Sequence, residues 1–488
     1  MNGALVYGGV ATPYAEVAAR ASRASQGFAE AGVAAGGTFA VMLKNDPAFI
    51  EAMLAARNLG AYWCSINWHF RAAETGYILA DCGAKCFLVG DEMLEAVSAA
   101  IPPGVRVIPL SEWESWRDSH APRSAAPTRP GNPMMYTSGT TGRPKGVKRY
   151  PSVDPEAHAR MSAEVWNKVY ALAPGARALM SAPLYHSAPN AYAMQAVLRD
   201  ATLWLEPGFD AERALALIHE ARITHAYLVP TMFSRMLKLP ETVKRRYDLT
   251  SMEFVVSMGS PCAPEVKRAM IEWWGPVIHE SYAASELGVV SFVHAREALA
   301  RPGTAGRPVG GAKIRILDDA GRELPAGETG LIYARQPATP DFTYLNNDAS
   351  RRSIERDGLL SLGDMGYLDA DGYLYICDRA VDMVISGGVN IYPAEIEAAL
   401  VGMPGVADCA VFGIPDAEFG ESLTAAVQPM PGAALDAAQV QAWLRERIAA
   451  YKVPRNVVFH AELPREESGK IFKRRLRDPY WQAAGRRI

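Results

Sequence analysis

The sequence predicts an α/β protein: a large N-terminal domain of parallel-sheet layers covered by helices, a small β-rich subdomain, and a small α+β C-terminal domain. Three observations support this prediction. The chain of 488 residues is too long for one hydrophobic core. Buried-strand patterns alternate with helical periodicity up to residue 300. Short strands with tight turns follow, and then a separate unit. We place the two domains at residues 1–379 and 380–488.

The first 140 residues show the strand–helix alternation. Thr12 and Pro13 predict a helix start, and apolar residues recur at helical spacing until Gly32. Asp46 and Pro47 are typical of a second helix start. Further strands are expected at 38–43, 61–66, 86–89 and 134–136, with helices at 47–59 and 72–80, and a proline-rich linker at 113–133.

The alternation continues to residue 300, and the polar motifs fall at the ends of strands. Open α/β sheets bind ligands at this edge. The unit after residue 379 holds a helix whose start at Asp436, with Gln439 three residues later, has the capping-box pattern. The remaining expected elements are strands at 178–182, 226–229 and 254–257, a helix at 211–221, a β-rich segment at 303–330, and strands at 407–414 and 423–428.

Composition and charge limit the classes of partner. The 50 basic and 53 acidic residues give a net charge of −3, which argues against nucleic acid as the main partner. No apolar run is long enough to span a membrane, and the first residues lack the basic region of a signal peptide. The six cysteines lie far apart without a complete metal-ligand pattern, as expected for thiols in a reducing compartment. We therefore predict a cytoplasmic location.

Residues 136–147 concentrate phosphate-binding chemistry, with five hydroxyl side chains and three glycines. A strand that runs into a loop of Gly, Ser and Thr presents backbone N–H groups and hydroxyls to a phosphate. A lysine adds mobile positive charge. Because Pro144 precedes that lysine, the loop is not a Walker A motif, in which Gly-Lys-Ser/Thr opens a helix. The candidates are Thr137, Ser138, Gly139, Thr140, Thr141, Gly142 and Lys145.

This stretch resembles the phosphate loop of the acyl-adenylate-forming (ANL) superfamily, which includes acyl-CoA synthetases, peptide-synthetase adenylation domains and luciferases. Further segments resemble the motifs of that family in the same order, and the resemblance covers nearly the whole chain. It implies an AMP-dependent acid–CoA ligase whose mobile C-terminal domain rotates after adenylation, so that one site serves two half-reactions. The segments are residues 282–286, 363–367 with 371–373, 379–395 and 464–470.

The resemblance assigns ATP and Mg²⁺ to particular side chains. Glu286 would hold Mg²⁺, a cation that prefers carboxylate oxygen. Ser285 replaces the threonine of the family but keeps the hydroxyl for the α-phosphate. Asp364 would accept hydrogen bonds from both ribose hydroxyls, and Arg379 would be a second ribose contact. The adenine contacts implied by the resemblance are Ser260, Pro261, Ser281 and Tyr282.

The same resemblance assigns the acyl and thiol chemistry. Lys470, on a loop in a basic tail, would bridge the α-phosphate and the carboxylate during adenylation. His186 would gate or line the acyl site. Gly387 and Gly388 would line the tunnel for the pantetheine arm of coenzyme A, because glycine leaves room. At the hinge position the family often has Asp or Lys, whereas this chain has Val381.

We therefore predict an ATP-dependent ligase that activates an apolar carboxylic acid, fatty, aromatic or alicyclic, as acyl-AMP. The acyl group then passes to coenzyme A, with release of AMP and pyrophosphate. Two alternatives stay open: a stand-alone amino-acid or aryl-acid adenylating enzyme, and a non-catalytic acyl- or nucleotide-binding protein. Residues 183–188 offer no acid to hold an α-amino group. A non-catalytic binding protein would tolerate the loss of Lys470 or Glu286, yet both residues are present.

The sequence does not determine the acid, and a homodimer is a further open alternative. Relatives that thread long acyl chains commonly have glycine where this chain has Met258 and Ala283. Added side-chain volume in a close-packed wall shortens a tunnel, so we expect a compact ring or medium chain. The expected apolar lining consists of Tyr192, Met194, Met232, Met258 and Cys262.

Overall fold

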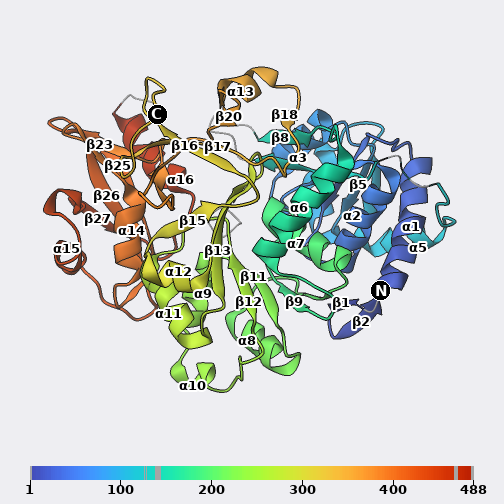
Figure 1. Cartoon of the computed structure of the whole chain (residues 1–488), viewed down its shortest axis with the longest axis horizontal. Helices are drawn as coiled ribbons and strands as arrows, with labels where there is room; N and C mark the ends of the chain where they lie inside the picture. Colours follow the sequence, from blue (N-terminus) through green and yellow to red (C-terminus); the bar gives the residue numbers. More distant parts are fainter. Residues whose placement is uncertain (1–2, 126, 128, 138–143, 466–470, 485–488) are drawn as a thin grey trace.

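The computed structural model describes residues 3–125, 127, 129–137, 144–465 and 471–484. A large N-terminal domain with two mixed sheets is followed by a smaller C-terminal domain around a third sheet, which confirms the predicted fold class (Figure 1). The chain runs from blue at the right of Figure 1, through green below, to orange and red at the left. Within the described residues, no helix combines the length and the apolar character needed to cross a bilayer.

The first sheet carries the hairpin in which the phosphate loop lies. Its seven strands have the order β18-β8-β7-β4-β3-β5-β6. Neighbouring strands from β7 to β6 pair in parallel, whereas β8, near one edge, pairs antiparallel with both β7 and β18. The bounds are β3 (Thr38–Met42), β4 (Tyr62–Ser65), β5 (Cys86–Val89), β6 (Arg106–Pro109), β7 (Asn132–Thr137), β8 (Lys145–Arg149) and β18 (Phe342–Tyr344).

The second sheet has fifteen strands and carries the nucleotide-site segments of the later sequence. Strands β10, β9, β11, β12 and β13 are parallel neighbours at its centre. The bounds are β1 (Ala4–Tyr7), β2 (Val10–Pro13), β9 (Arg177–Met180), β10 (Thr202–Leu205), β11 (His225–Leu228), β12 (Phe254–Ser257), β13 (Ile278–Ala284), β14 (Gly288–Val293), β15 (Thr304–Pro308), β16 (Lys313–Leu317), β17 (Gly330–Arg335), β19 (Glu355–Arg356), β20 (Leu359–Leu360), β21 (Asp364–Leu368) and β22 (Leu374–Arg379).

Helices cover the sheets and join their strands. The helices of the N-terminal domain are α1 (Tyr14–Glu30), α2 (Pro47–Leu59), α3 (Ala72–Asp81), α4 (Asp91–Val97), α5 (Trp113–Asp118), α6 (Pro155–Tyr170), α7 (Ser187–Leu198), α8 (Ala211–Glu220), α9 (Pro230–Leu237), α10 (Glu241–Lys244), α11 (Pro264–Trp274), α12 (Ala295–Ala300) and α13 (Asp348–Ser353), with 3₁₀ turns at Ser98–Ala100 and Leu110–Glu112.

The C-terminal domain has the sheet order β24-β23-β26-β25, with β27 beside β26. Lys473 and Glu397 join two of its helices through an ion pair of 2.8 Å. Lys238 of α9 donates to the carbonyl of Ala407, so the two domains touch there. The bounds are β23 (Val384–Ser386), β24 (Val389–Ile391), α14 (Pro393–Val401), β25 (Val406–Asp416), β26 (Gly420–Pro429), α15 (Ala437–Arg445), a 3₁₀ turn (Ala450–Lys452), β27 (Asn456–Phe459) and α16 (Lys473–Ala483).

Local signals set the ends of several helices as predicted. At the start of α2, the carboxylate of Asp46 accepts the N–H of Ala48 at 2.8 Å. Gly60 ends that helix with φ of +74°, a left-handed conformation that glycine adopts without steric cost. At α15, Asp436 and Gln439 exchange hydrogen bonds of 2.8 and 2.9 Å, which confirms the capping box.

Three sequence predictions are wrong in detail, each because of pairing or packing with another element. The first helix begins at Tyr14, since Pro13 belongs to β2, which pairs with β1. Residues 113–133 are not a plain linker: they contain α5, whose Arg117 donates to the buried Glu51 of α2 at 2.8 Å. The predicted β-rich subdomain pairs onto the second sheet through β14 and β15 and is continuous with it.

Candidate active site

The hairpin β7–β8 brings the two ends of the phosphate loop together. Thr137 and Lys145 are paired residues across the hairpin. The Lys145 ammonium lies 5.2 Å from the ring centroid of Tyr344, a cation–π contact. The hairpin therefore holds one hydroxyl and one cation at the mouth of the loop. The other predicted loop residues lie outside the described residues: Ser138, Gly139, Thr140, Thr141 and Gly142.

Glu286 lies against this hairpin, although it comes from the turn after β13 in the second sheet. Its Oε1 accepts hydrogen bonds from the hydroxyls of Thr137 at 3.1 Å and Tyr344 at 3.0 Å. The side chain is only 7% exposed. Burial, together with the nearby Glu286, raises the pKa of Tyr344, so the phenol stays protonated as a donor. A buried carboxylate at the mouth of the phosphate loop fits the preference of Mg²⁺ for a carboxylate shared with nucleotide phosphates.

Arg149, which sequence reasoning did not single out, holds the Glu286 turn in place. Its guanidinium donates to the carbonyls of Glu286 at 3.0 Å and Pro340 at 2.7 Å, and also to the carbonyl of Ser285. Burial lowers the pKa of Arg149 to about 10, and it remains a cation at neutral pH. No local pattern marks this residue, because its partners lie more than a hundred positions away in the chain.

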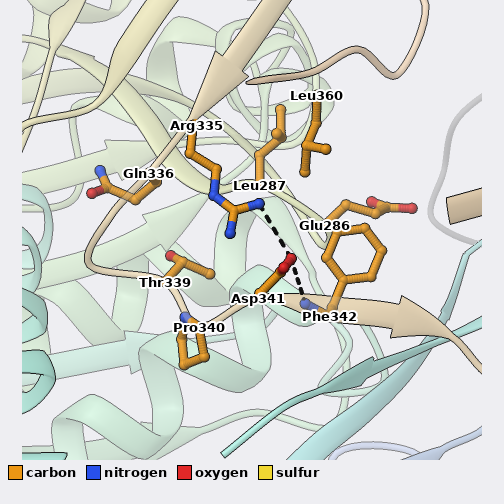
Figure 2. Close-up of a pocket in the computed structure, with 9 residues that line it drawn as sticks. All are labelled: Glu286, Leu287, Arg335, Gln336, Thr339, Pro340, Asp341, Phe342 and Leu360. Atoms are coloured by element: carbon orange, nitrogen blue, oxygen red, sulfur yellow. Dashed lines mark hydrogen bonds and ion pairs between the residues drawn. The ribbon is translucent and has the colours of Figure 1, made fainter. Parts of the chain in front are cut away.

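A small pocket lies beside Glu286. Figure 2 shows Asp341 accepting hydrogen bonds from Arg335 at 3.2 Å and from the N–H of Phe342 at 2.8 Å. Leu287 and Leu360 supply apolar wall. The Asp341 carboxylate thus orders the segment before β18, the strand that carries Tyr344.

Ser285 connects the motif to the start of α7. Its hydroxyl donates to the hydroxyl of Ser187 at 2.8 Å. His186 precedes Ser187 and is the N-cap of α7. Burial lowers the pKa of His186 to about 4, so the imidazole is neutral at physiological pH. Its Nε2 is buried without a hydrogen-bond partner among the described residues. A gating role for His186 stays a prediction, and Ser285 is positioned beside it.

The predicted ribose contacts come together at the junction of β13, β21 and β22. Asp364 and Arg379 are paired across β21 and β22, with Arg379 Nε 3.7 Å from Asp364 Oδ1. Tyr282 donates its hydroxyl to Asp364 Oδ2 at 2.6 Å. Burial, and then the Asp364 carboxylate, raise the pKa of Tyr282 far above its usual value. The aromatic predicted to contact adenine therefore also orients the acid predicted to bind ribose.

The remaining adenine candidates differ in their availability. The Ser281 hydroxyl donates to the carbonyl of Ser291 at 2.7 Å inside the sheet, so it is already used within the protein. Ser260 and Pro261 follow Gly259, whose φ of +97° turns the chain after β12, and Pro261 is exposed. A nucleotide base can thus reach the 260–261 loop, whereas the Ser281 hydroxyl already has a partner in the sheet.

The structure places one further predicted part, the glycine pair, away from this site. Gly387 and Gly388 form the exposed turn between β23 and β24 in the C-terminal domain, with φ of +58° and +79°. Figure 1 shows this hairpin at the left side of the molecule, away from the β7–β8 hairpin. Lys470, the predicted catalytic lysine, lies outside the described residues.

Known proteins match this chain over nearly its full length. The chain matches the family described as AMP-binding enzyme over residues 2–340 and the AMP-binding enzyme C-terminal domain over 395–470. It is 34% identical to feruloyl-CoA synthase of Amycolatopsis sp over 97% of this chain and 95% of the relative. It is 33% identical to indoleacetate–CoA ligase of Aromatoleum aromaticum, over 94% and 91%.

Solved structures agree with the sequence relatives. The anthranilate CoA ligase AuaEII, in complex with anthranoyl-AMP, superposes with a TM-score of 0.89 and 25% identity, over 99% of this chain and 95% of that one. The chain is therefore an enzyme of the acyl-CoA synthetase class, an AMP-forming acid–thiol ligase. It belongs to the AMP-binding enzyme family, and the resemblance predicted from its motifs is confirmed.

The hydrogen bonds of Arg149 predict a role in positioning Ser285 and Glu286. We expect Arg149→Lys to slow ATP–pyrophosphate exchange by roughly tenfold to a hundredfold, because one ammonium cannot replace a planar fork that holds three carbonyls, and small misplacements are costly. Arg335→Lys is the matched control, since the Arg335 guanidinium donates to the Asp341 side chain and, among the described residues, to no carbonyl of the Glu286 turn. Parental exchange rates in Arg149→Lys would show that the positioning role is wrong.

The pairing of Tyr282 and Arg379 with Asp364 predicts a specific defect in ATP binding. Asp364→Ala removes a charged acceptor worth about 1.5–3 kcal/mol, so the apparent KM for ATP should rise more than the KM for the acid. Steady-state kinetics with each substrate varied in turn measure this difference. Asp319→Ala, at an exposed acid in a turn, is the control. An unchanged KM for ATP in folded Asp364→Ala would exclude the ribose role.

Proposed function

We propose that this enzyme activates a compact, ring-containing carboxylic acid as an acyl-adenylate and transfers the acyl group to coenzyme A. The observation that supports the ring is a cluster of buried aromatic side chains, Tyr170, Tyr192 and Tyr227, beside α7. Aromatic side chains pack well against aromatic rings. Three of the similar enzymes, feruloyl-CoA synthase, indoleacetate–CoA ligase and anthranilate CoA ligase, are named for ring acids, whereas another, long-chain-fatty-acid–CoA ligase FadD13, is named for fatty acids.

In the first half-reaction, an oxygen of the substrate carboxylate attacks the α-phosphorus of ATP, and the bond to the β-phosphate oxygen breaks as pyrophosphate leaves. Both reactants are anions, so oriented cations and donors must stabilise the developing charge. In this proposal Lys145 and Thr137 contact the β- and γ-phosphates, and the hydroxyl of Ser285 contacts the α-phosphate. Lys470 bridges the two reacting groups.

A divalent cation completes the charge balance of this step in our proposal. Glu286 would hold Mg²⁺ with the hydroxyl of Thr137 beside it, a donor set of hard oxygens that suits this ion. When bound, Mg²⁺ draws negative charge from the phosphate oxygens. Arg149 ties the Glu286 turn to the hairpin through a hydrogen bond of 3.0 Å.

In the second half-reaction, the sulfur of coenzyme A attacks the acyl carbon, the bond to AMP breaks, and the thiol proton leaves to solvent. We propose that residues 380–488 turn as a unit for this step, which would carry the exposed Gly387–Gly388 turn to the pantetheine path. Val381 at the hinge position is 53% exposed, and its carbonyl accepts from Arg477 at 3.1 Å. That hydrogen bond would have to break or follow the rotation.

Two further parts of the proposal concern substrate size and location. Met258 is 1% exposed and belongs to the same hydrophobic cluster as Tyr192 and Tyr227. Its volume there supports a short acyl site. All six cysteines are free thiols, which supports a reducing compartment such as the cytoplasm.

A graded panel of acids tests the proposed substrate class. With ATP and coenzyme A, thioester formation should be fastest with arylacrylic and arylacetic acids and at least roughly tenfold slower with palmitate, since one misfit apolar group costs about 1–3 kcal/mol in a packed pocket. Pyrophosphate release without thioester would favour the adenylating enzyme of the alternatives. A preference for palmitate would contradict the short acyl site.

The role proposed for Lys470 predicts that its substitution affects adenylation but not thioester formation. Lys470→Ala should slow pyrophosphate release by orders of magnitude, since contacts to developing charge are worth several kcal/mol. The variant, given synthetic acyl-adenylate, should still form the thioester. Arg474→Ala removes another cation of the same tail, one that pairs with Asp478, and serves as control. Near-normal pyrophosphate release by Lys470→Ala would refute the assignment.

A further inference from the structure

Three tyrosines form a compact buried cluster between α6, α7 and β11. The rings of Tyr170 and Tyr192 are 5.0 Å apart and nearly perpendicular, and those of Tyr192 and Tyr227 are 5.9 Å apart. None is more than 2% exposed. Figure 1 shows α6, α7 and β11 as neighbours at the centre of the N-terminal domain. The cluster therefore lies in the interior and not on a surface where water would satisfy its hydroxyls.

The hydroxyls of two of these tyrosines have different surroundings. Tyr170 donates to the carbonyl of Ala188 at 3.4 Å, in the first turn of α7. The hydroxyl oxygen of Tyr192 is buried and has no hydrogen-bond partner within the described part of the chain. Buried polar groups are almost always hydrogen-bonded, because an unpaired one destabilises the folded state. The Tyr192 hydroxyl is thus a donor for which the described residues supply no acceptor.

The position of the cluster indicates what could supply that acceptor. On one side, the first turn of α7 is joined to the adenylation motif through the hydrogen bond between Ser187 and Ser285. On the other side, the Tyr227 hydroxyl is 3.9 Å from the place a side chain would take at Gly259, in the loop of the predicted adenine contacts. In the proposed site the acyl group starts near these two segments, and Tyr192 is connected to both, since it belongs to α7 and its ring lies 5.9 Å from that of Tyr227.

We propose that Tyr192 determines substrate specificity by donating its hydroxyl hydrogen to a neutral oxygen substituent, an ether or a hydroxyl, on the ring of the acyl substrate. This inference rests on the proposed function and narrows its substrate class to oxygen-substituted ring acids. Burial raises the pKa of the Tyr192 phenol, so it acts as a neutral donor. Met258 and Met232, of the same buried cluster, are apolar, and apolar walls accept a neutral oxygen far better than an ionised one.

Isosteric substrates test this proposal with the unmodified enzyme. Methoxycinnamates and ethylcinnamates, substituted at C3 or at C4, have nearly the same shape, but only the methoxy group accepts a hydrogen bond. We expect kcat/KM for thioester formation to be about threefold to tenfold higher for the methoxy member of at least one pair, the factor of one neutral hydrogen bond. Equal values in both pairs would overturn the inference even if every variant failed to fold.

Two variants then identify the residue. Tyr192→Phe should remove the preference for methoxy over ethyl, with a smaller effect on the ethyl substrates. Tyr170→Phe, whose hydroxyl already has a protein partner, should keep the preference and is the matched control. A preference that survives in Tyr192→Phe would overturn the role of Tyr192. If the unmodified enzyme used no cinnamate at all but used straight-chain acids, the proposed function itself would fail.

Discussion

The site depends on one guanidinium that crosses the seam between the two sheets of the N-terminal domain. Arg149 ends β8 in the seven-stranded sheet, and it donates to carbonyls of Ser285 and Glu286, which follow β13 in the fifteen-stranded sheet. A third bond reaches Pro340 before β18. Turn carbonyls inside a protein need donors, and a planar guanidinium satisfies several at once. Arg149 therefore helps to set the position of Glu286 relative to the β7–β8 hairpin.

Charge is divided unequally between the two sides of the site. On the proposed nucleotide side lie several ionisable side chains: Lys145 and Arg149 of β8, Glu286 next to Arg149, and Asp364 paired with Arg379. On the acyl side, burial keeps His186 neutral and raises the pKa values of the tyrosines. This division suits a reaction in which two anions meet at phosphorus while an apolar ring stays desolvated, because charges are needed only where negative charge develops.

The C-terminal domain has a core of its own, which includes Val411, Val427 and Leu444. The buried ion pair between Lys473 and Glu397 ties its last helix to α14. Both features support the proposal that this domain moves as a unit. In Figure 1 the Gly387–Gly388 turn lies at the left of the molecule, away from β8 and the proposed nucleotide site. Adenylation and thioester formation would therefore need different orientations of the two domains.

The sequence by itself predicted many of the helices and strands and the caps of α2 and α15, and its resemblance to a family singled out the phosphate loop, Glu286 and Asp364 as candidates. These features depend on neighbours in the chain or on motifs that persist as short strings. Only the tertiary structure decided that Thr137 meets Glu286 across 149 positions, that Arg149 donates to the carbonyls of Ser285 and Glu286, and that the β-rich segment joins the second sheet. Such contacts depend on which strands become neighbours, and no local periodicity encodes that order. That the described residues offer the Tyr192 hydroxyl no partner has the same origin, since burial and hydrogen-bond partners are properties of packing and not of residue type.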